Sequence, residues 1–411
     1  MFSFLKNNKI IRIAAFLLVA LLFGILIYNL FFKSLSEPSL DVTTGTTTPG
    51  AKLPEAGPGS PSTGTEPEGQ TRLQPETGPE SAGDEIASGG ITRANVISEA
   101  GGMAAKLSGD GLSLLQYNGR DGLFYRIDQN GNTEPLTDKI FHEVQSVYWA
   151  PEGEKAILEY PDGANILYNF KTNSQTTLPA HWKDFDFSSS GDEIVMKSIG
   201  TDENNRWLAI ANADGSKARA LEALGGEADR VYPSWSPNKQ SVAMFTESTG
   251  FDEQKVYFVG LNNENFKSLT ITGRGLKFLW SPEGDRLLYS VYSSDSDLKP
   301  ALWAANAKGE AIGSGRKNLN IFTWADKCVF SGNENAYCAV PETLEEGSGL
   351  YPELANASPD ALYEINIYTG QKKLVATPET PASMRNLILT ENGRYLYYSD
   401  PEGKTYKMRL K

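Results

Sequence analysis

The sequence predicts an all-β fold, a seven-bladed β-propeller with four-stranded antiparallel blades. Three observations predict it: a repeat over roughly the last three hundred residues, many short strand patterns, and turns rich in Gly, Pro, Asn and Asp. In each repeat an apolar or aromatic landmark residue ends a strand, and a turn follows directly. The seven copies are Leu107-Ser-Gly-Asp-Gly, Trp149-Ala-Pro-Glu-Gly, Phe187-Ser-Ser-Ser-Gly, Trp235-Ser-Pro-Asn-Lys, Trp280-Ser-Pro-Glu-Gly, Trp324-Ala-Asp-Lys and Leu389-Thr-Glu-Asn-Gly.

The second repeat gives the plan of one blade. Strand patterns cover residues 144–149, 155–160, 164–170 and 175–178, with a turn after each of the first three. Four antiparallel strands within about 40 residues make a propeller blade. Because one blade cannot bury both of its faces, we expect the landmark aromatic to wedge between neighbouring blades and bury about 150–250 Å².

The spacing of the landmarks also predicts how the ring closes. Landmarks lie 38 to 48 residues apart, except for the last interval of 65 residues, which predicts an insertion at about 341–359. The last repeat ends after three strands, while the strand pattern at 91–97 precedes the first repeat. Supplying that strand to the last blade closes the ring and removes its exposed edges. Six or eight blades are the alternatives.

The N-terminal region predicts a membrane anchor. Residues 13–32 are apolar apart from one Asn, and twenty helical residues span about 30 Å, the thickness of a bilayer core. Three basic residues lie within 1–12 and only Lys33 closely follows, so the N-terminus is expected in the cytoplasm and the rest outside it. The alternative is a cleaved signal peptide, whose apolar core is normally shorter.

Residues 33–90 are expected to be a disordered linker before the propeller at 91–411. Residues 41–90 contain 30 Gly, Pro, Ser or Thr, and no aromatic residue occurs between Phe32 and Tyr117. Such a stretch buries too little apolar surface to offset its ordering entropy.

Composition excludes several classes of function. The net charge is −13 and the pI is about 4.9, whereas a nucleic-acid-binding protein presents a basic face. With two His and two Cys the chain is too poor in ligands for a multi-ligand soft-metal site, and no cofactor is expected.

Cys328 and Cys338 predict a disulfide. Asn333 lies at the centre of the turn between them, five residues from each. In a hairpin this makes the cysteines cross-strand neighbours, at about the 5.5 Å Cα separation that a disulfide needs. The alternative is two buried free thiols.

Candidate ligand-binding residues precede or begin the innermost strands, in loops that share one face of the ring. They are His142, His181, Trp182, Arg230, Tyr232, Arg274 and Arg385. Cations and aromatics converging on the mouth of an acidic ring are suited to an anionic or peptide-like ligand. The alternatives are that the arginines only balance neighbours such as Glu227 and Asp229, and that the histidines are merely exposed. A metal would need further ligands, such as Glu143 or Asp184.

Signatures of an enzyme are missing from the sequence. There is no G-x-S-x-G elbow and no Gly-rich phosphate loop. Paired carboxylates from different blades remain an alternative, since glycosidases use them; by position the candidates are Asp184, Asp186 and Asp229.

Two landmarks carry a resemblance to a known family. Trp235-Ser-Pro-Asn-Lys-Gln and Trp280-Ser-Pro-Glu-Gly-Asp-Arg-Leu-Leu-Tyr resemble the WD-like propeller repeat of the periplasmic Tol-system protein, which also occurs in prolyl oligopeptidases. The resemblance covers 91–411 at the level of the repeat and implies the propeller fold, not an activity. An anchor and tether replace the N-terminal domain of the Tol protein, and this layout resembles anchored propellers of small-genome bacteria.

The sequence therefore predicts a monomeric, membrane-anchored, extracytoplasmic propeller that binds an envelope protein or a cell-surface polymer without catalysis. The alternatives are a glycan hydrolase or lyase with carboxylates in the channel, and a structural hub.

Overall fold

The computed structural model describes residues 21, 23, 83–99 and 101–411. Apart from Leu21 and Phe23, the predicted membrane segment at 13–32 lies outside the described residues, as does the predicted linker up to residue 82. Among the described residues, no helix combines the length and the apolar character that crossing a membrane requires.

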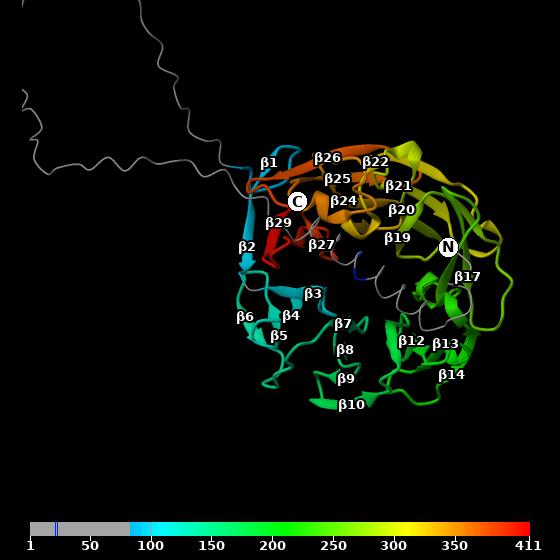
Figure 1. Cartoon of the computed structure of the whole chain (residues 1–411). Coiled ribbons are helices and arrows are strands. Elements are labelled where there is room, and N and C mark those ends of the chain that lie inside the picture. Colours follow the sequence, from blue (N-terminus) through cyan, green and yellow to red (C-terminus); the bar gives the residue numbers. More distant parts are fainter. Residues whose placement is uncertain (1–20, 22, 24–82, 100) are drawn as a thin grey trace, which may run out of the picture. The chain divides into compact units, whose positions relative to one another are not determined.

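Seven antiparallel blades form a ring (Figure 1), which confirms the predicted fold. Blade 1 contains β3 (Gly102–Leu107), β4 (Leu114–Asn118), β5 (Leu123–Ile127) and β6 (Thr133–Pro135). Blade 2 contains β7 (Ser146–Trp149), β8 (Lys155–Glu159), β9 (Asn165–Asn169) and β10 (Ser174–Leu178). Blade 3 contains β11 (Trp182–Phe187), β12 (Glu193–Ile199), β13 (Arg206–Asn212) and β14 (Arg219–Ala223). Blade 4 contains β15 (Val231–Pro233), β16 (Ala243–Ser248), β17 (Glu253–Val259) and β18 (Leu269–Thr272). Blade 5 contains β19 (Arg274–Trp280), β20 (Arg286–Tyr292), β21 (Ala301–Asn306) and β22 (Lys317–Phe322). Blade 6 contains β23 (Cys328–Ser331), β24 (Asn335–Pro341), β25 (Asp360–Asn366) and β26 (Lys372–Pro378), and blade 7 contains β27 (Arg385–Leu389), β28 (Tyr395–Ser399) and β29 (Thr405–Arg409).

The first strand of each blade lies toward the centre of the ring. First strands of neighbouring blades contact one another in succession, from β23 through β27, β3, β7 and β11 to β15. The chain enters all first strands from the same side, which we call the strand-entry face. The turns that follow the landmark residues lie on the opposite face, because each first strand runs from one face to the other.

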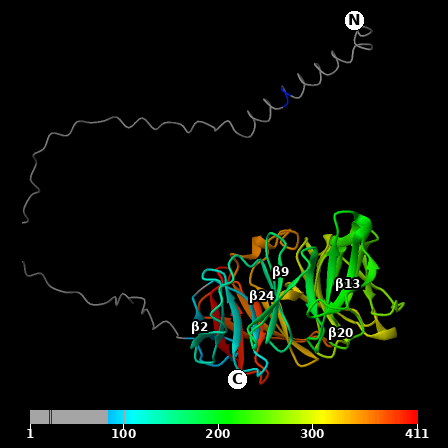
Figure 2. The same ribbon diagram turned by 90° about the horizontal axis from the view of Figure 1, so that it is seen from below.

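The N-terminal strand completes the last blade, as predicted. β2 (Ala94–Ser98) pairs antiparallel with β29, with Ala94 opposite Met408. Figure 2 shows β2 and β13 of blade 3 on opposite sides of the ring. The strand pattern at 91–97 is divided, however, because β1 (Ile91–Thr92) pairs in parallel with β26 and adds a fifth strand to blade 6.

The residues before β1 also hydrogen-bond to the ring. The amide of Ala87 donates to the carbonyl of Arg409 at 3.0 Å, and that of Gly89 donates to Val375 at 2.9 Å. Residues 83–98, here called the N-terminal clasp, therefore hold the outer edges of blades 6 and 7 together.

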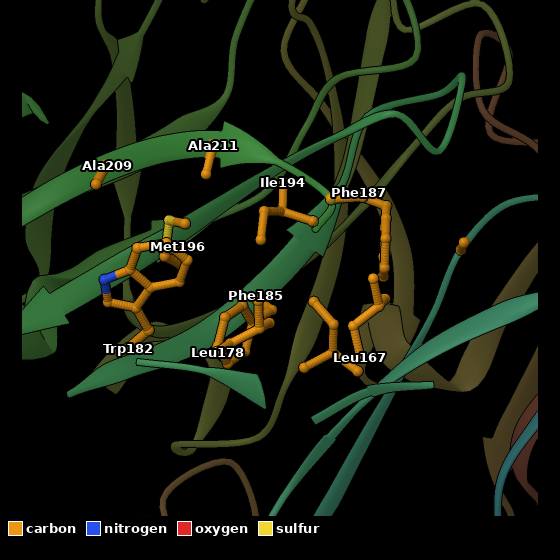
Figure 3. Packing of buried hydrophobic residues seen from close by; sticks show 12 residues of the cluster. Leu167, Leu178, Trp182, Phe185, Phe187, Ile194, Met196, Ala209 and Ala211 are labelled. Carbon is orange, nitrogen blue, oxygen red and sulfur yellow. The ribbon is translucent and has the colours of Figure 1, made fainter. Parts of the chain in front are cut away.

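The hydrophobic core is divided among the contacts between blades. Seven apolar clusters each join one pair of neighbouring blades. Figure 3 shows the cluster between blades 2 and 3, where Leu178 of blade 2 lies beside Phe185 of blade 3 and Leu167 lies beside Phe187. The smallest cluster lies between blades 7 and 1, where the ring closes, and its fully buried members are Leu114, Ile127 and Tyr397.

One landmark was wrong. Trp324 does not end an inner strand; it precedes the short 3-10 helix η6 (Ala325–Lys327), which enters the first strand of blade 6. The equivalent position belongs to Phe330, next to Ser331, which is the last residue of β23 before the turn at 332–334. The sequence at Trp324 resembles the other landmarks because an aromatic residue followed by small and acidic residues is compatible with a turn at either end of a strand.

The landmark tryptophans bridge neighbouring blades. Trp280 packs on Phe258 of blade 4 with 5.9 Å between ring centroids, and its indole N–H donates to Ser234 of that blade at 3.1 Å. The Trp149 indole likewise donates to the carbonyl of Ala104 in blade 1 at 2.7 Å. The expected wedge between blades is confirmed for these two residues.

Trp280→Ala is expected to lower the free energy of unfolding by about 3 kcal/mol, because it removes an aromatic wedge and a hydrogen bond between two blades. Thermal or denaturant unfolding measures the loss. Trp207→Ala is the matched control, since this indole is 37% exposed. An equal effect of both substitutions would contradict the wedge role.

Candidate functional site

The predicted ligand-binding residues lie at the starts of the first strands, on the strand-entry face. Trp182, Arg274 and Arg385 each begin a first strand, and Tyr232 lies within β15. His142, His181 and Arg230 precede first strands in the entering loops. They are spread over blades 2, 3, 4, 5 and 7 and do not gather in one cavity.

Three of these residues contact other side chains, one within its own loop and two across the boundary between blades 4 and 5. The Arg230 guanidinium lies 2.6 Å from Glu227, so the charge balance weighed as the alternative is present there. The Arg274 guanidinium lies 4.5 Å from the ring centroid of Phe251, a side chain that is 76% exposed. Tyr232 packs edge-on against the ring of Phe278.

The two histidines are exposed, and Trp182 belongs to the core. The Trp182 side chain is 5% exposed between blades 2 and 3, and the His181 ring packs edge-on against it with 6.4 Å between centroids. In the described part of the chain, no three His, Cys, Asp or Glu side chains are grouped so that they hold a metal ion.

A cavity of about 340 Å³ opens on the strand-entry face between blades 5, 6 and 7; we call it the entry pocket. It contains Arg385 from the predicted set. Its lining residues are Lys277, Trp324, Asp326, Lys327, Pro352, Glu353, Ala355, Asn356, Ser383, Arg385 and Asn386.

The predicted insertion in blade 6 builds one wall of the entry pocket. It connects β24 with β25 and includes the 3-10 helix η7 (Pro352–Ala355). Two of its amides fasten it to blade 5: Gly347 donates to the carbonyl of Asp297 at 3.0 Å, and Gly349 donates to Leu298 at 2.8 Å. The spacing of the landmarks predicted the insertion, but not that it packs against blade 5.

A bulge at the start of β27 places Arg385 at the pocket. The pairing register shifts between Arg385 and Ile388, and Asn386 has a φ of 50°. Asn accepts this left-handed conformation more readily than most residues, and a bulge turns the flanking side chains out of the regular alternation. The Arg385 guanidinium then donates to the amide oxygen of Asn356 on the insertion, which ties blade 7 to this wall.

The floor of the pocket contains a buried ion pair. The Lys327 ammonium lies 2.5 Å from Asp360, whose carboxylate is fully buried and also accepts the amide of Met384 at 2.5 Å. Burial lowers the pKa of Lys327 and raises the pKa of Asp360, each against the attraction of its partner. Within the described part of the chain, the second carboxylate oxygen of Asp360 has no hydrogen-bond partner. Loss of either residue would therefore leave the other as an unpaired buried charge, which strongly destabilises a fold.

The pocket combines positive charge with an aromatic wall. Lys277, Lys327 and Arg385 contribute three cations, and the Lys327 ammonium lies 6.0 Å from the ring centroid of Trp324. Lys277 is paired with Asp326 at 3.5 Å. Such a site can hold an anionic group by charge-assisted hydrogen bonds and an apolar group beside it.

The candidate carboxylates of the enzyme alternative are held by separate contacts. Asp186 accepts the amide of Trp235 at 2.6 Å, and burial raises its pKa to about 6. Asp184 lies 2.7 Å from the ammonium of Lys197, while Asp229 is exposed on the 3-10 helix η3 (Gly225–Arg230). Asp186 thus joins blades 3 and 4 structurally.

The disulfide forms as predicted. Cys328 and Cys338 lie directly opposite each other on β23 and β24, with their Cα atoms 4.1 Å apart. The bond joins the two strands of the inner hairpin of blade 6, and Lys327 directly precedes Cys328 in the sequence.

The fold and the pocket define the class: a seven-bladed β-propeller with a pocket of mixed charge on its strand-entry face. Neither the models of known protein families nor the curated proteins give a match to the sequence. Among solved structures, the β-propeller domain of Cps50 (Swd1) from Myceliophteria thermophila is similar, with 12% identity, a TM-score of 0.51, and coverage of 77% of this chain and 100% of that one. At this identity the likeness supports the fold alone.

Two further solved structures are similar at lower TM-scores. An oligogalacturonate lyase in complex with manganese has 13% identity and a TM-score of 0.46, covering 78% of this chain and 90% of that one. TolB from Acinetobacter baumannii has 14% identity and a TM-score of 0.42, covering 65% of each chain.

Proposed function

We propose that this protein is a membrane-anchored, extracytoplasmic binding module that recognises an envelope protein or cell-surface ligand without catalysis. The observation that carries the proposal is the entry pocket, where three cations and Trp324 converge on the strand-entry face. Loops on a rigid ring are where propellers usually present recognition surfaces.

The proposed location rests on the sequence and on the disulfide. The apolar segment at 13–32, with basic residues before it, is suited to an anchor with a cytoplasmic N-terminus. Everything after the anchor then lies in an oxidising compartment, where a disulfide such as Cys328–Cys338 persists.

The binding function is favoured over a glycan hydrolase or lyase by the lining of the pocket. Hydrolysis by paired carboxylates needs two free acidic groups about 5–10 Å apart. Asp184 and Asp186 are each engaged in contacts of their own, and Asp326 in the entry pocket pairs with Lys277.

The test is affinity capture from an envelope extract with the full-length protein in detergent. We expect Arg385→Glu to reduce the captured partner to background, because it reverses the charge of the pocket wall. Arg230→Glu, on the same face but outside the pocket, is expected to retain the partner. Equal capture by both variants would show that the pocket is not the binding site.

A further inference from the structure

We infer that the ligand of the entry pocket is a peptide segment that presents a single carboxylate beside an apolar side chain. This inference rests on the proposed function and narrows it to one ligand class. It follows from the donors left free on Lys327 and Arg385, the charge balance of the pocket and the apolar side chains on its rim.

Lys327 offers a fixed hydrogen-bond donor at the floor. Its side chain is 10% exposed, so the ammonium has little freedom to move. Of its three N–H groups, one faces Asp360 and a second lies 3.4 Å from the Ser383 hydroxyl. No other described protein group accepts the third, and Lys327 lines the cavity. Asp360 thus fixes the ammonium in place.

Arg385 supplies the second set of donors. Its guanidinium has five N–H groups, and its side-chain partner in the described chain is the neutral amide of Asn356. No described carboxylate forms an ion pair with it. Arginine presents two parallel N–H groups to a carboxylate, so this side chain is prepared for a bidentate contact.

The charge balance favours a monoanion over a dianion. The lining contains Lys277, Lys327 and Arg385 together with Asp326 and Glu353, and the buried Asp360 pairs with Lys327. The net charge of these six groups is zero, although Arg385 is unpaired. A phosphate dianion would add two negative charges to a pocket that already contains Asp326 and Glu353, whereas one carboxylate can be accommodated by Lys327 and Arg385.

The rim favours a peptide. On the insertion, Leu350, Tyr351 and Leu354 are 46%, 55% and 44% exposed, and they flank the pocket-lining residues 352–353 in the sequence. Trp324 adds an aromatic side chain to the lining. The cavity of about 340 Å³ lies at the small end of ligand sites, which suits one or two side chains of an extended segment.

The experiment presents immobilised full-length protein in detergent with three degenerate hexapeptide libraries, all N-acetylated. The first ends in a free carboxylate, the second ends in an amide but carries one Glu, and the third is amidated and has no carboxylate. Retained peptides are quantified by mass spectrometry. We expect enrichment of one or both carboxylate libraries on the order of tenfold over the third, with apolar residues next to the acid. The first two libraries distinguish a chain terminus from an acidic side chain.

Variants assign the effect to the pocket. Arg385→Gln is expected to remove the carboxylate preference, while Arg230→Gln keeps it. Lys327→Met combined with Asp360→Asn removes both buried charges together and is expected to weaken binding similarly while the ring stays folded. Equal retention of all three libraries, or retention of none, overturns the inference.

The outcome is separable from that of the proposed function. If an acidic oligosaccharide is retained in an Arg385-dependent manner and no peptide is, the ligand class is wrong although the pocket still binds. If the envelope capture loses its dependence on Arg385 as well, the proposed function fails together with the inference.

Discussion

Lys327→Met is expected to lower the free energy of unfolding by about 4 kcal/mol at neutral pH. The substitution leaves the fully buried Asp360 carboxylate without its counter-ion, and breaking one member of a buried pair commonly costs about 3–5 kcal/mol. Thermal and denaturant unfolding measure the loss. The control is Lys277→Met, which removes a cation from the same pocket at a half-exposed pair with Asp326 and should cost less than about 1 kcal/mol.

The loss should also depend on pH in a defined direction. Burial already raises the pKa of Asp360 in the folded protein, and removing the ammonium raises it further. A carboxyl group with a raised folded-state pKa destabilises the fold above that pKa, and this penalty disappears below the unfolded-state pKa of about 3.9. The deficit of the variant relative to wild type should therefore shrink as the pH falls from about 8 toward 4. A deficit that stays constant would contradict the role of Asp360.

Removing the N-terminal clasp is expected to lower the free energy of unfolding by more than Lys327→Met does. A chain that starts at residue 99 lacks the strand that pairs with β29, so its ring closes through the direct contacts between blades 7 and 1. These are the small cluster of Leu114, Ile127 and Tyr397 and a few hydrogen bonds, such as that from Gln116 to Thr405 at 3.2 Å. The lost backbone pairing and the contacts of Ile97 should together remove on the order of 5 kcal/mol. The freed edge of β29 should also promote association between molecules.

A chain that starts at residue 83 is the matched control, since it keeps the whole clasp. We expect it to melt like the full-length protein and to elute as the same species in size-exclusion chromatography. Adding a synthetic peptide of residues 83–98 to the shorter chain should restore part of its stability. Equal melting temperatures for the two truncated chains would show that the clasp does not close the ring.

Much of the fold was predictable because the repeat is local. The landmark and its turn lie within five residues, and the cysteine hairpin within eleven, so spacing alone predicted blades, closure and disulfide. The prediction that Trp324 ends an inner strand was wrong. Its local sequence matches the landmark, but its position before β23 depends on the strand register of the whole blade.

The pocket was harder to predict because it is assembled over long distances in the sequence. Arg385 was selected by its place before an inner strand. Lys327 and Asp360 are 33 residues apart, and no sequence motif pairs them. The insertion was visible only as extra length. Its contacts with Asp297 and Leu298 in blade 5 are non-local, and no periodicity encodes them.

Pairing of β2 with β29 sets the order in which the molecule is finished during synthesis. β2 leaves the ribosome directly after β1 and before every other blade strand, yet its partner is made roughly 300 residues later. At about 5–20 residues per second this interval lasts about 15–60 s. Throughout it β2 lacks its partner strand while six other blades appear. The ring therefore cannot close blade by blade as the chain emerges, because the last blade is complete only after β29 has been made.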